Sequence, residues 1–168
     1  VINVKGIALN KKQFLVTFGE ESEKAVTKTV YNGKSQVPEV TALNENVNYT
    51  VTYKQGKTIL TAEQVKNAGS YSLIITGKGN YSGTLTYNFS ISKQDLAKAY
   101  SAGQLAIEKS PAVVYTPLGA KGTPAVTFNG ETLAEGTDFT LSFSGNKTVT
   151  DSASMTLKGK GNFSGTLD

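Results

Sequence analysis

The 168-residue chain contains no cysteine, no histidine, no tryptophan and no arginine. Without cysteine, the chain can have no disulfide framework, no thiol nucleophile and no thiolate metal site. Without histidine, it lacks the usual general base near neutral pH and the commonest metal ligand. We therefore predict that the protein is not an enzyme, with no catalytic residues, no cofactor and no bound metal.

The basic residues are all lysine, 17 of them against 13 acids, for a net charge of +4. Nucleic-acid readers depend on arginine for bidentate contacts, and no basic cluster here is larger than the pair Lys11 and Lys12. The composition therefore predicts no nucleic-acid partner. Thinly spread lysines serve solubility first, and weak attraction to acidic glycans or an anionic surface is the alternative.

No apolar run approaches the roughly 18 residues that a membrane-spanning helix needs, so we predict no membrane span. The chain begins at Val1, without a methionine or a signal peptide, which we interpret as the start of a processed or excised fragment. A composition rich in Thr, Ser, Asn and Gly and free of Cys is compatible with a protein exposed outside the cell.

Alternation of apolar and polar residues dominates the chain. In LTYNFSI, at residues 85–91, every odd position is apolar and every even one polar, as in a half-buried strand. The same period runs through residues 49–53, 71–75, 139–143 and 155–157, with turn signals such as Asn-Gly between strands. These patterns predict an all-β sandwich or barrel. For the first core they predict the apolar strand residues Tyr49, Val51, Tyr53, Leu73, Ile75, Tyr87, Phe89 and Ile91.

Two short segments carry helical signals. Thr61 and Gln64 have the spacing of a capping box, flanked by Leu60 and Val65 in the positions of a hydrophobic staple, so one helical turn is predicted there. A second turn is predicted at residues 95–98, inside a polar connector.

One segment of the chain is present twice. GKGNYSG at residues 77–83 returns as GKGNFSG at residues 159–165. The two copies begin 82 residues apart, at residues 77 and 159. A repeat of that length indicates a whole small domain, because the repeats of solenoids and propellers are shorter. We therefore predict two domains, residues 1–94 and 95–168. The copies also match upstream, where VPEVT at 37–41 corresponds to TPAVT at 123–127 and YTVTY at 49–53 to FTLSF at 139–143.

The order YNGKSQVPEV, NYTVTY and GKGNYSGT followed by an alternating strand resembles the bacterial immunoglobulin-like (Ig-like) repeats found in tandem on large surface proteins. The second copy repeats it as TPAVTF, GTDFTLSF and GKGNFSGTL. The resemblance implies two tandem Ig-like antiparallel β-sandwich domains, extracellular placement at the cell surface and no catalytic residues. The sequence departs from the family pattern at residues 61–65 and at residues 116–124, and both segments are expected to be loops.

The function that the resemblance implies is a noncatalytic stalk, spacer or adhesive module of a larger bacterial surface protein. Its partners would be neighbouring domains and a weakly bound glycan or protein of a host surface or cell wall; the sequence names no ligand-binding residue. One alternative is an Ig-like decoration or host-attachment domain on a phage virion. Another is an accessory domain of a polysaccharide-degrading enzyme.

Two clusters that suggest ion binding have simpler interpretations. The acidic run Glu20, Glu21, Ser22 and Glu23 lacks the alternating pattern of a calcium loop, so we interpret it as a solvated turn. Each GKGN segment leads into a strand rather than a helix, which favours a turn over a phosphate cradle. Tyr81 and Phe163 are then expected to plug the cores beside these turns.

Two modification chemistries are also considered. The sequence contains Asn-X-Ser/Thr patterns that a composition rich in these residues generates by itself, at Asn48, Asn80, Asn88, Asn146 and Asn162. A self-formed Lys–Asn isopeptide link would need a buried Lys, Asn and acid together, which we do not expect.

The second copy lacks the continuation of its last strand. In the first copy the segment after Gly83 runs through residues 84–91, whereas the second stops at Asp168. A sandwich without this strand loses about three buried apolar side chains, each worth roughly 1.5–3 kcal/mol. We expect the natural chain to continue past Asp168, with donation of a strand by another chain as the alternative, and an extended chain to melt higher.

Overall fold

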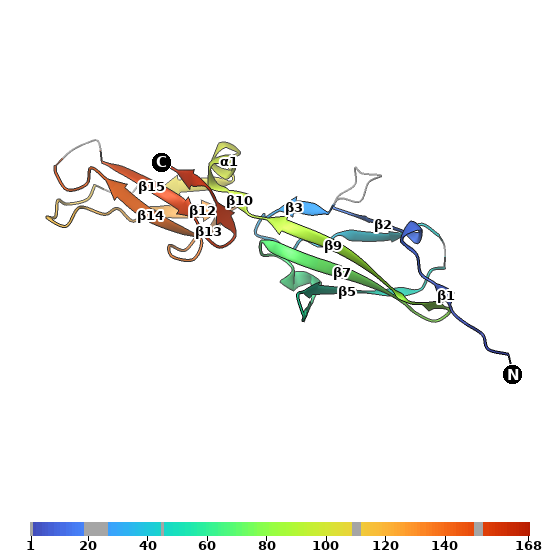
Figure 1. Cartoon of the computed structure of the whole chain (residues 1–168). Coiled ribbons are helices and arrows are strands. Elements are labelled where there is room, and N and C mark those ends of the chain that lie inside the picture. Colours follow the sequence, from blue (N-terminus) through green and yellow to red (C-terminus); the bar gives the residue numbers. More distant parts are fainter. Residues whose placement is uncertain (1, 19–26, 45, 109–111, 150–152) are drawn as a thin grey trace. The chain divides into compact units, whose positions relative to one another are not determined.

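The computed structural model describes residues 2–18, 27–44, 46–108, 112–149 and 153–168 (Figure 1). Its regular structure is mostly β, as the alternation predicted. The chain falls into two compact units. Unit 1 consists of the residues up to Val30 together with Lys34–Ser92, and unit 2 consists of Tyr31–Gly33 together with Lys93–Asp168.

A five-stranded sheet forms the larger layer of unit 1. The neighbours β9, β7 and β5 run antiparallel to one another, β6 continues from β5 as a hairpin, and β3 pairs parallel with β9. Their alternating sequences give the sheet one apolar and one polar face. In sheet order the strands are β3 (Lys28–Val30), β9 (Thr84–Ser92), β7 (Gly69–Gly77), β5 (Tyr49–Gln55) and β6 (Thr58–Leu60).

A smaller layer faces the apolar side of this sheet. It consists of the antiparallel strands β2 (Phe14–Thr17) and β4 (Glu39–Ala42). Phe14 meets Tyr49 of β5 with ring centroids 5.0 Å apart, and Phe18, just after β2, meets Phe89 of β9 at 5.6 Å. These edge-to-face contacts join the two layers across the core.

The predicted core of unit 1 is found on the expected face, but only part of it is fully buried. The aliphatic residues Leu73, Ile75 and Ile91 are buried together with Phe89. The other four predicted residues, Tyr49, Val51, Tyr53 and Tyr87, are half-buried. Alternation predicts the side of a sheet to which a residue points, but the depth of burial depends on how far the opposing layer extends. The buried Phe14, Val16, Val65 and Tyr71 complete this core.

Both predicted helical turns are present. The first is the 3-10 helix η2 (Ala62–Gln64), where the Gln64 side chain accepts a hydrogen bond from the Thr61 N–H at 2.9 Å. The second is α1 (Leu96–Ser101), which is longer than the predicted turn. Its N-cap residue Asp95 accepts a hydrogen bond from the Lys98 N–H at 3.0 Å. A further 3-10 helix, η1 (Lys11–Gln13), precedes β2.

Unit 2 contains two three-stranded antiparallel sheets. One has the order β11 (Leu105–Glu108), β12 (Ala125–Phe128) and β13 (Glu131–Thr132). The other has the order β14 (Phe139–Ser144), β15 (Ser154–Gly159) and β17 (Thr166–Leu167). β17 pairs with β15 at Leu157 and Lys158. The core holds Leu96, Ala99, Leu105, Val126, Phe128, Phe139, Leu157 and Phe163.

Short parallel pairs recur at corresponding places in the two units. In unit 1, β1 (Ile7–Ala8) pairs with β8 (Tyr81–Ser82). In unit 2, β10 (Gln94–Asp95) pairs with β16 (Phe163–Ser164). In each unit, therefore, the two residues that follow GKGN pair with a strand from that unit's N-terminal part.

Tyr31 packs against the core of unit 2. Its ring stacks on Phe128 with centroids 6.0 Å apart and meets the edge of Phe163 at 5.4 Å. The neighbouring Asn32 accepts, through its carbonyl oxygen, a hydrogen bond from the Asn129 side-chain amide at 3.1 Å. Unit 2 is therefore completed by a three-residue segment that precedes the rest of it in sequence by about 60 residues.

Candidate functional site

The GKGN segments form tight turns, as predicted. In unit 1 the Gly77 N–H donates to the Gly83 carbonyl oxygen at 3.0 Å and the Tyr81 N–H to that of Lys78 at 3.2 Å. The Lys78 N–H donates to the Asn48 carbonyl oxygen at 2.9 Å. Because these N–H groups are already paired within the protein, they are not available to bind a phosphate.

The turn in unit 2 has the same hydrogen bonds. The Gly159 N–H donates to the Gly165 carbonyl oxygen at 2.9 Å, the Phe163 N–H to that of Lys160 at 2.9 Å, and the Lys160 N–H to that of Asp138 at 2.8 Å. Phe163 is 1% exposed and plugs the core as predicted, whereas Tyr81 is only half-buried.

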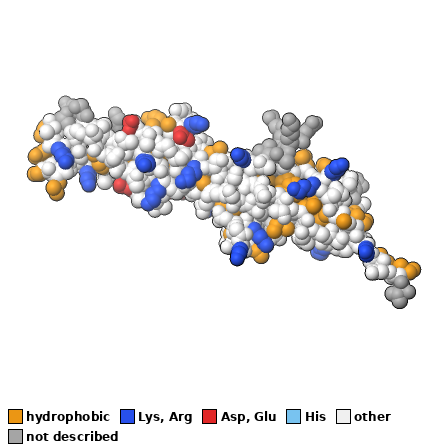
Figure 2. All heavy atoms as spheres, in the orientation of Figure 1, with side chains coloured by type: hydrophobic (Ala, Val, Ile, Leu, Met, Phe, Trp, Pro, Cys, Tyr) orange, Lys and Arg blue, Asp and Glu red, His pale blue; other side chains and the backbone are white. Residues whose placement is uncertain are grey.

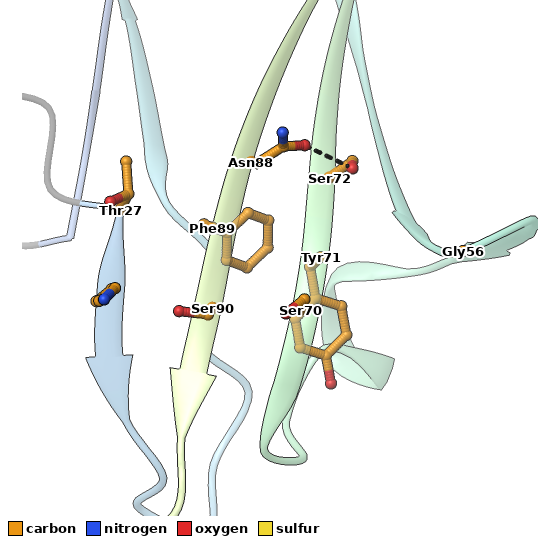
Figure 3. A pocket seen from close by; sticks show the side chains of 9 residues that line it. Thr27, Gly56, Ser70, Tyr71, Ser72, Asn88, Phe89 and Ser90 are labelled. Carbon is orange, nitrogen blue, oxygen red and sulfur yellow. Dashed lines mark hydrogen bonds between the residues drawn. The ribbon is translucent and has the colours of Figure 1, made fainter.

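An open groove of about 510 Å³ lies on the five-stranded sheet of unit 1 (Figure 3). β7 and β9 supply most of its lining, with β3 on one side and the turn after β5 on the other. The lining residues are Thr27, Lys28, Gly56, Ser70, Tyr71, Ser72, Asn88, Phe89 and Ser90.

Strand register places the polar side chains of the groove in two rows. One row runs from Lys28 through Ser90 to Ser70, and the next contains Asn88 and Ser72. The Ser72 hydroxyl donates to the Asn88 side-chain oxygen at 2.9 Å, the contact drawn as a dashed line in Figure 3. These residues alternate along the strands with core residues, so their side chains share the outer face.

Two buried aromatic residues lie on the strands that form the floor of the groove. Tyr71 and Phe89 are each 4% exposed and stack with ring centroids 5.4 Å apart. Burial raises the pKa of the Tyr71 hydroxyl, which donates to the Asn67 carbonyl oxygen at 2.7 Å. Neither ring is exposed enough to stack against a ligand.

The groove offers hydroxyls, one side-chain amide and one ammonium group, and none of its described lining residues is an acid. Such groups can hydrogen-bond to a polar ligand such as a sugar. They do not make a nucleophile and base pair, because Ser72 donates to the amide of Asn88, which is not a base. In chemical terms the described lining residues offer hydrogen-bonding groups to a polar ligand.

Sequence reasoning did not identify this groove. Its signal was present as serines at the alternate positions 70 and 72, facing Asn88 and Ser90 on the next strand, but the pairing of those strands was needed to bring them together.

The residues singled out by sequence are scattered rather than gathered. Of the five candidate glycosylation asparagines, Asn48, Asn80 and Asn88 are exposed and Asn146 and Asn162 are half-buried. The acidic run Glu20, Glu21, Ser22 and Glu23 lies outside the described residues. Among the residues that the structure describes, no three His, Cys, Asp or Glu gather to hold a metal ion. In that same part of the chain, no helix has the length and apolar character needed to cross a membrane.

Other tyrosines have pKa values above the usual range. Burial raises those of Tyr53 and Tyr87, and the buried Tyr87 hydroxyl oxygen has no hydrogen-bond partner among the described residues. For Tyr31 in unit 2, burial is the main cause of a raised pKa. The negative charge of Asp138 adds to the effect, and a hydrogen bond with Asn162 opposes it.

Residues 24–95 match the model of a protein family described as the MBG domain. The match begins before β3 and ends at β10, so it takes in the groove and the first GKGN turn. No curated protein and no solved structure matches the chain. The MBG domain is a β-rich, noncatalytic module type typical of extracellular proteins, so residues 24–95 are similar to a module of a larger extracellular protein.

Proposed function

We propose that the chain is a pair of tandem Ig-like modules, residues 1–94 and 95–168, that act as a noncatalytic spacer or stalk in a bacterial surface protein. The family match and the all-β structure support an extracellular module. The finer proposal, that one kind of module is used twice, is supported by the hydrogen bonds that the two units share.

The observation that carries the proposal is the hydrogen bond between each GKGN turn and the strand that pairs with the residues after it. The Ile7 N–H donates to the Asn80 carbonyl oxygen at 2.8 Å, and the Gln94 N–H to that of Asn162 at 3.0 Å. Asn80 and Asn162 are the last letters of the two GKGN segments. Each unit therefore uses the same turn to hold its N-terminal strand, as expected of two copies of one module.

A spacer needs independently packed units and no ligand. Each unit has its own buried core, and the described lining of the candidate groove includes no exposed ring and no acid. Modules that pack separately can be joined in tandem to hold the ends of a protein at a set distance. The stability of such an array is approximately the sum of the stabilities of its modules and their interfaces.

A glycan and host-surface protein array, followed by calorimetry on any hit, tests this function. A spacer should bind nothing more tightly than about 1 mM. Tight, saturable binding of one ligand, or turnover by the pure chain, would overturn the spacer proposal.

The second candidate is an adhesive module, and the groove of unit 1 is the observation that favours it. If the array yields a glycan that depends on the groove, Lys28→Ala and Asn88→Ala should each weaken its binding. Thr86→Ala, on the same strand β9 but outside the groove, is the matched control and should leave binding unchanged.

The sequence of the full-length protein would separate the remaining alternatives. A wall anchor would support the surface stalk, a capsid or tail domain would support a virion protein, and a catalytic domain would support an accessory role in polysaccharide degradation.

A further inference from the structure

Strand β14 lies at the edge of its sheet in unit 2 (Figure 1). It pairs with β15 along its whole length, and among the described residues no strand pairs with its other side. Of the strands at the edges of the described sheets, β14 is the longest, and its sequence FTLSFS contains no proline and no charged residue. Proteins commonly protect an exposed edge with a short strand, a bulge, a proline or a charge. The edge at β14 has none of these four features.

The hydrogen bonds around β14 show which of its backbone groups face outward. The Gly159 N–H donates to the Gly165 carbonyl oxygen at 2.9 Å, so the backbone groups of Gly159 face β17 rather than β14. Phe139, which lies opposite Gly159, is therefore in a pair without hydrogen bonds, and its own N–H and C=O face away from β15. Every second residue of a strand faces the same way, so the backbone groups of Leu141 and Phe143 also face outward.

One of these outward groups has a partner within unit 2. The Gly136 N–H donates to the Phe139 carbonyl oxygen at 2.7 Å, which covers the edge at the start of β14. The N–H and C=O groups of Leu141 and Phe143 have no hydrogen-bond partner in the part of the chain that the structure describes. These two residues therefore present open donors and acceptors with the spacing of a β-strand.

Unit 1 covers the corresponding edge with a strand of its own. β5 corresponds to β14, with Tyr53 at the position of Phe143. Gln55 and Thr58 flank a two-residue turn and exchange hydrogen bonds, and two residues further along the hairpin Tyr53 and Leu60 do the same. Residues 56–68, which connect β5 to β7, contain β6, whereas the shorter segment 145–153 connects β14 to β15. Within its described residues, unit 2 has no counterpart of β6.

The side chains at the open edge are apolar on one face and polar on the other. Leu141 packs against the core of unit 2, and both Leu141 and Phe143 are half-buried. An added strand would place its own side chains beside them on that face. On the opposite face Thr140, Ser142 and Ser144 are exposed and uncharged. On the side of the molecule drawn in Figure 2, lysine side chains are scattered among uncharged polar ones. Backbone pairing, rather than charge, would therefore select the partner.

We propose that β14 binds an extended peptide segment as an added antiparallel strand, through the backbone groups of Leu141 and Phe143. The segment has apolar residues opposite Leu141 and Phe143 and a Thr or Ser between them. In this mode of recognition the main-chain hydrogen bonds give affinity and the alternate side chains give specificity. Because only two residues of β14 have open groups, a free peptide should bind weakly, with a Kd of about 1 mM or weaker. Linkage to a neighbouring module would supply such a segment at mM local concentration.

An NMR titration of the full chain with a synthetic peptide tests the proposal. The probe is KTILTAE, the sequence of residues 57–63, because it contains β6. With Leu60 opposite Phe143, the probe places Ala62 opposite Leu141 and Thr61 between the two. At up to about 5 mM the probe should shift the amide resonances of Leu141 and Phe143 progressively. Resonances of β11, in the other sheet, should not move.

N-methylated probes separate backbone pairing from nonspecific contact. A methyl group on the Leu60 nitrogen removes the N–H that would donate to Phe143, so the shifts should fall at least about fivefold. A methyl group on the Ile59 nitrogen is the matched control, because that N–H would point away from β14, and binding should be unchanged.

Two variants of the chain make the same comparison from the other side. Phe143→Pro removes the outward N–H of β14, a position where an edge strand tolerates proline, and should abolish the shifts. Phe143→Ala retains that N–H and should weaken binding less. If Phe143→Pro does not fold, the N-methylated probes still decide the outcome.

The proposal fails if the probe shifts no β14 resonance, if the two N-methylated probes bind equally, or if Phe143→Ala prevents binding as completely as a folded Phe143→Pro. It also fails if the chain alone forms a dimer that Phe143→Pro dissociates in analytical ultracentrifugation, because the partner of β14 is then a second copy. Failure would leave the spacer function untouched, because the ligand array tests that function separately.

Discussion

A Cβ atom added to Gly159 would lie 2.6 Å from the backbone nitrogen of Ser164. The corresponding distance from Gly77 to Ser82 is 2.8 Å. Both glycines end a strand, β15 or β7, at the point where the backbone after the GKGN turn passes close to the strand. The repeated motif therefore begins with glycine because there is no room for a side chain, not because the backbone needs a positive φ there.

Gly159→Ala should destabilise unit 2, and Gly77→Ala unit 1, by about 1–3 kcal/mol, because the crossing backbone must move. Urea unfolding measures the loss. Gly69→Ala is the matched control: its Cβ would meet the side-chain nitrogen of Gln55 at 2.8 Å, and the end of a flexible side chain can move aside. Equal losses at Gly69 and Gly77 would show that the close crossing is not what requires glycine.

Tyr87→Phe should leave stability unchanged or raise it by up to about 1 kcal/mol. The buried Tyr87 hydroxyl oxygen has no hydrogen-bond partner in the part of the chain that the structure describes, so removing it removes an uncompensated polar group. Tyr71→Phe should do the opposite and cost about 1 kcal/mol, since the Tyr71 hydroxyl donates to the Asn67 carbonyl oxygen. Thermal unfolding of the two variants compares them directly, and a greater loss for Tyr87→Phe would contradict the prediction.

Tyr31→Ala should destabilise unit 2 by about 2 kcal/mol, less than the loss of a fully buried ring, because Tyr31 is half-buried. Hydrogen exchange at core amides of unit 2, such as that of Leu157, reports the effect. The exposed Tyr100→Ala is the control and should change stability by no more than about 0.5 kcal/mol. If unit 2 amides exchange at wild-type rates in Tyr31→Ala, then Tyr31 does not support that core.

The free energy of unfolding should fall as the pH rises above about 10, the pKa of an unfolded tyrosine. Burial raises the pKa values of Tyr53, Tyr71 and Tyr87, so in this range the unfolded chain releases protons that the folded chain retains. Below that pH the tyrosines are protonated in both states, so they do not make the free energy of unfolding depend on pH. Urea unfolding between about pH 8 and pH 11 should show a smaller alkaline loss for Tyr87→Phe than for wild type. An identical loss would mean that Tyr87 titrates alike in both states.

Sequence alone predicted what local patterns determine. Alternation identified the face of β9 that carries Phe89 and Ile91, and the spacing of Thr61 and Gln64 identified the turn at η2. It could not predict the place of Tyr31, because Tyr-Asn-Gly indicates a turn and nothing nearby indicates which core that turn contacts. The two-residue strands β1 and β10 are too short to show a period.

The candidate groove was missed for a related reason. A serine on a polar strand face is ordinary, and only the register between β7 and β9 gathers Ser70, Ser72 and Asn88 into one surface. The sequence of a single strand does not show which residues of another strand it will pair with.

The parallel pairing of β1 with β8 determines how unit 1 would respond to a pulling force. Tension on the chain ahead of Ile7 would run along β1, roughly perpendicular to the bonds from the Ile7 N–H to Asn80 and from the Leu9 N–H to Ser82. Bonds sheared in this way share the load and must break together, whereas bonds at a frayed hairpin end break one at a time. Since forced unfolding is governed by the rate of barrier crossing rather than by equilibrium stability, this small pair of strands would act as a mechanical clamp.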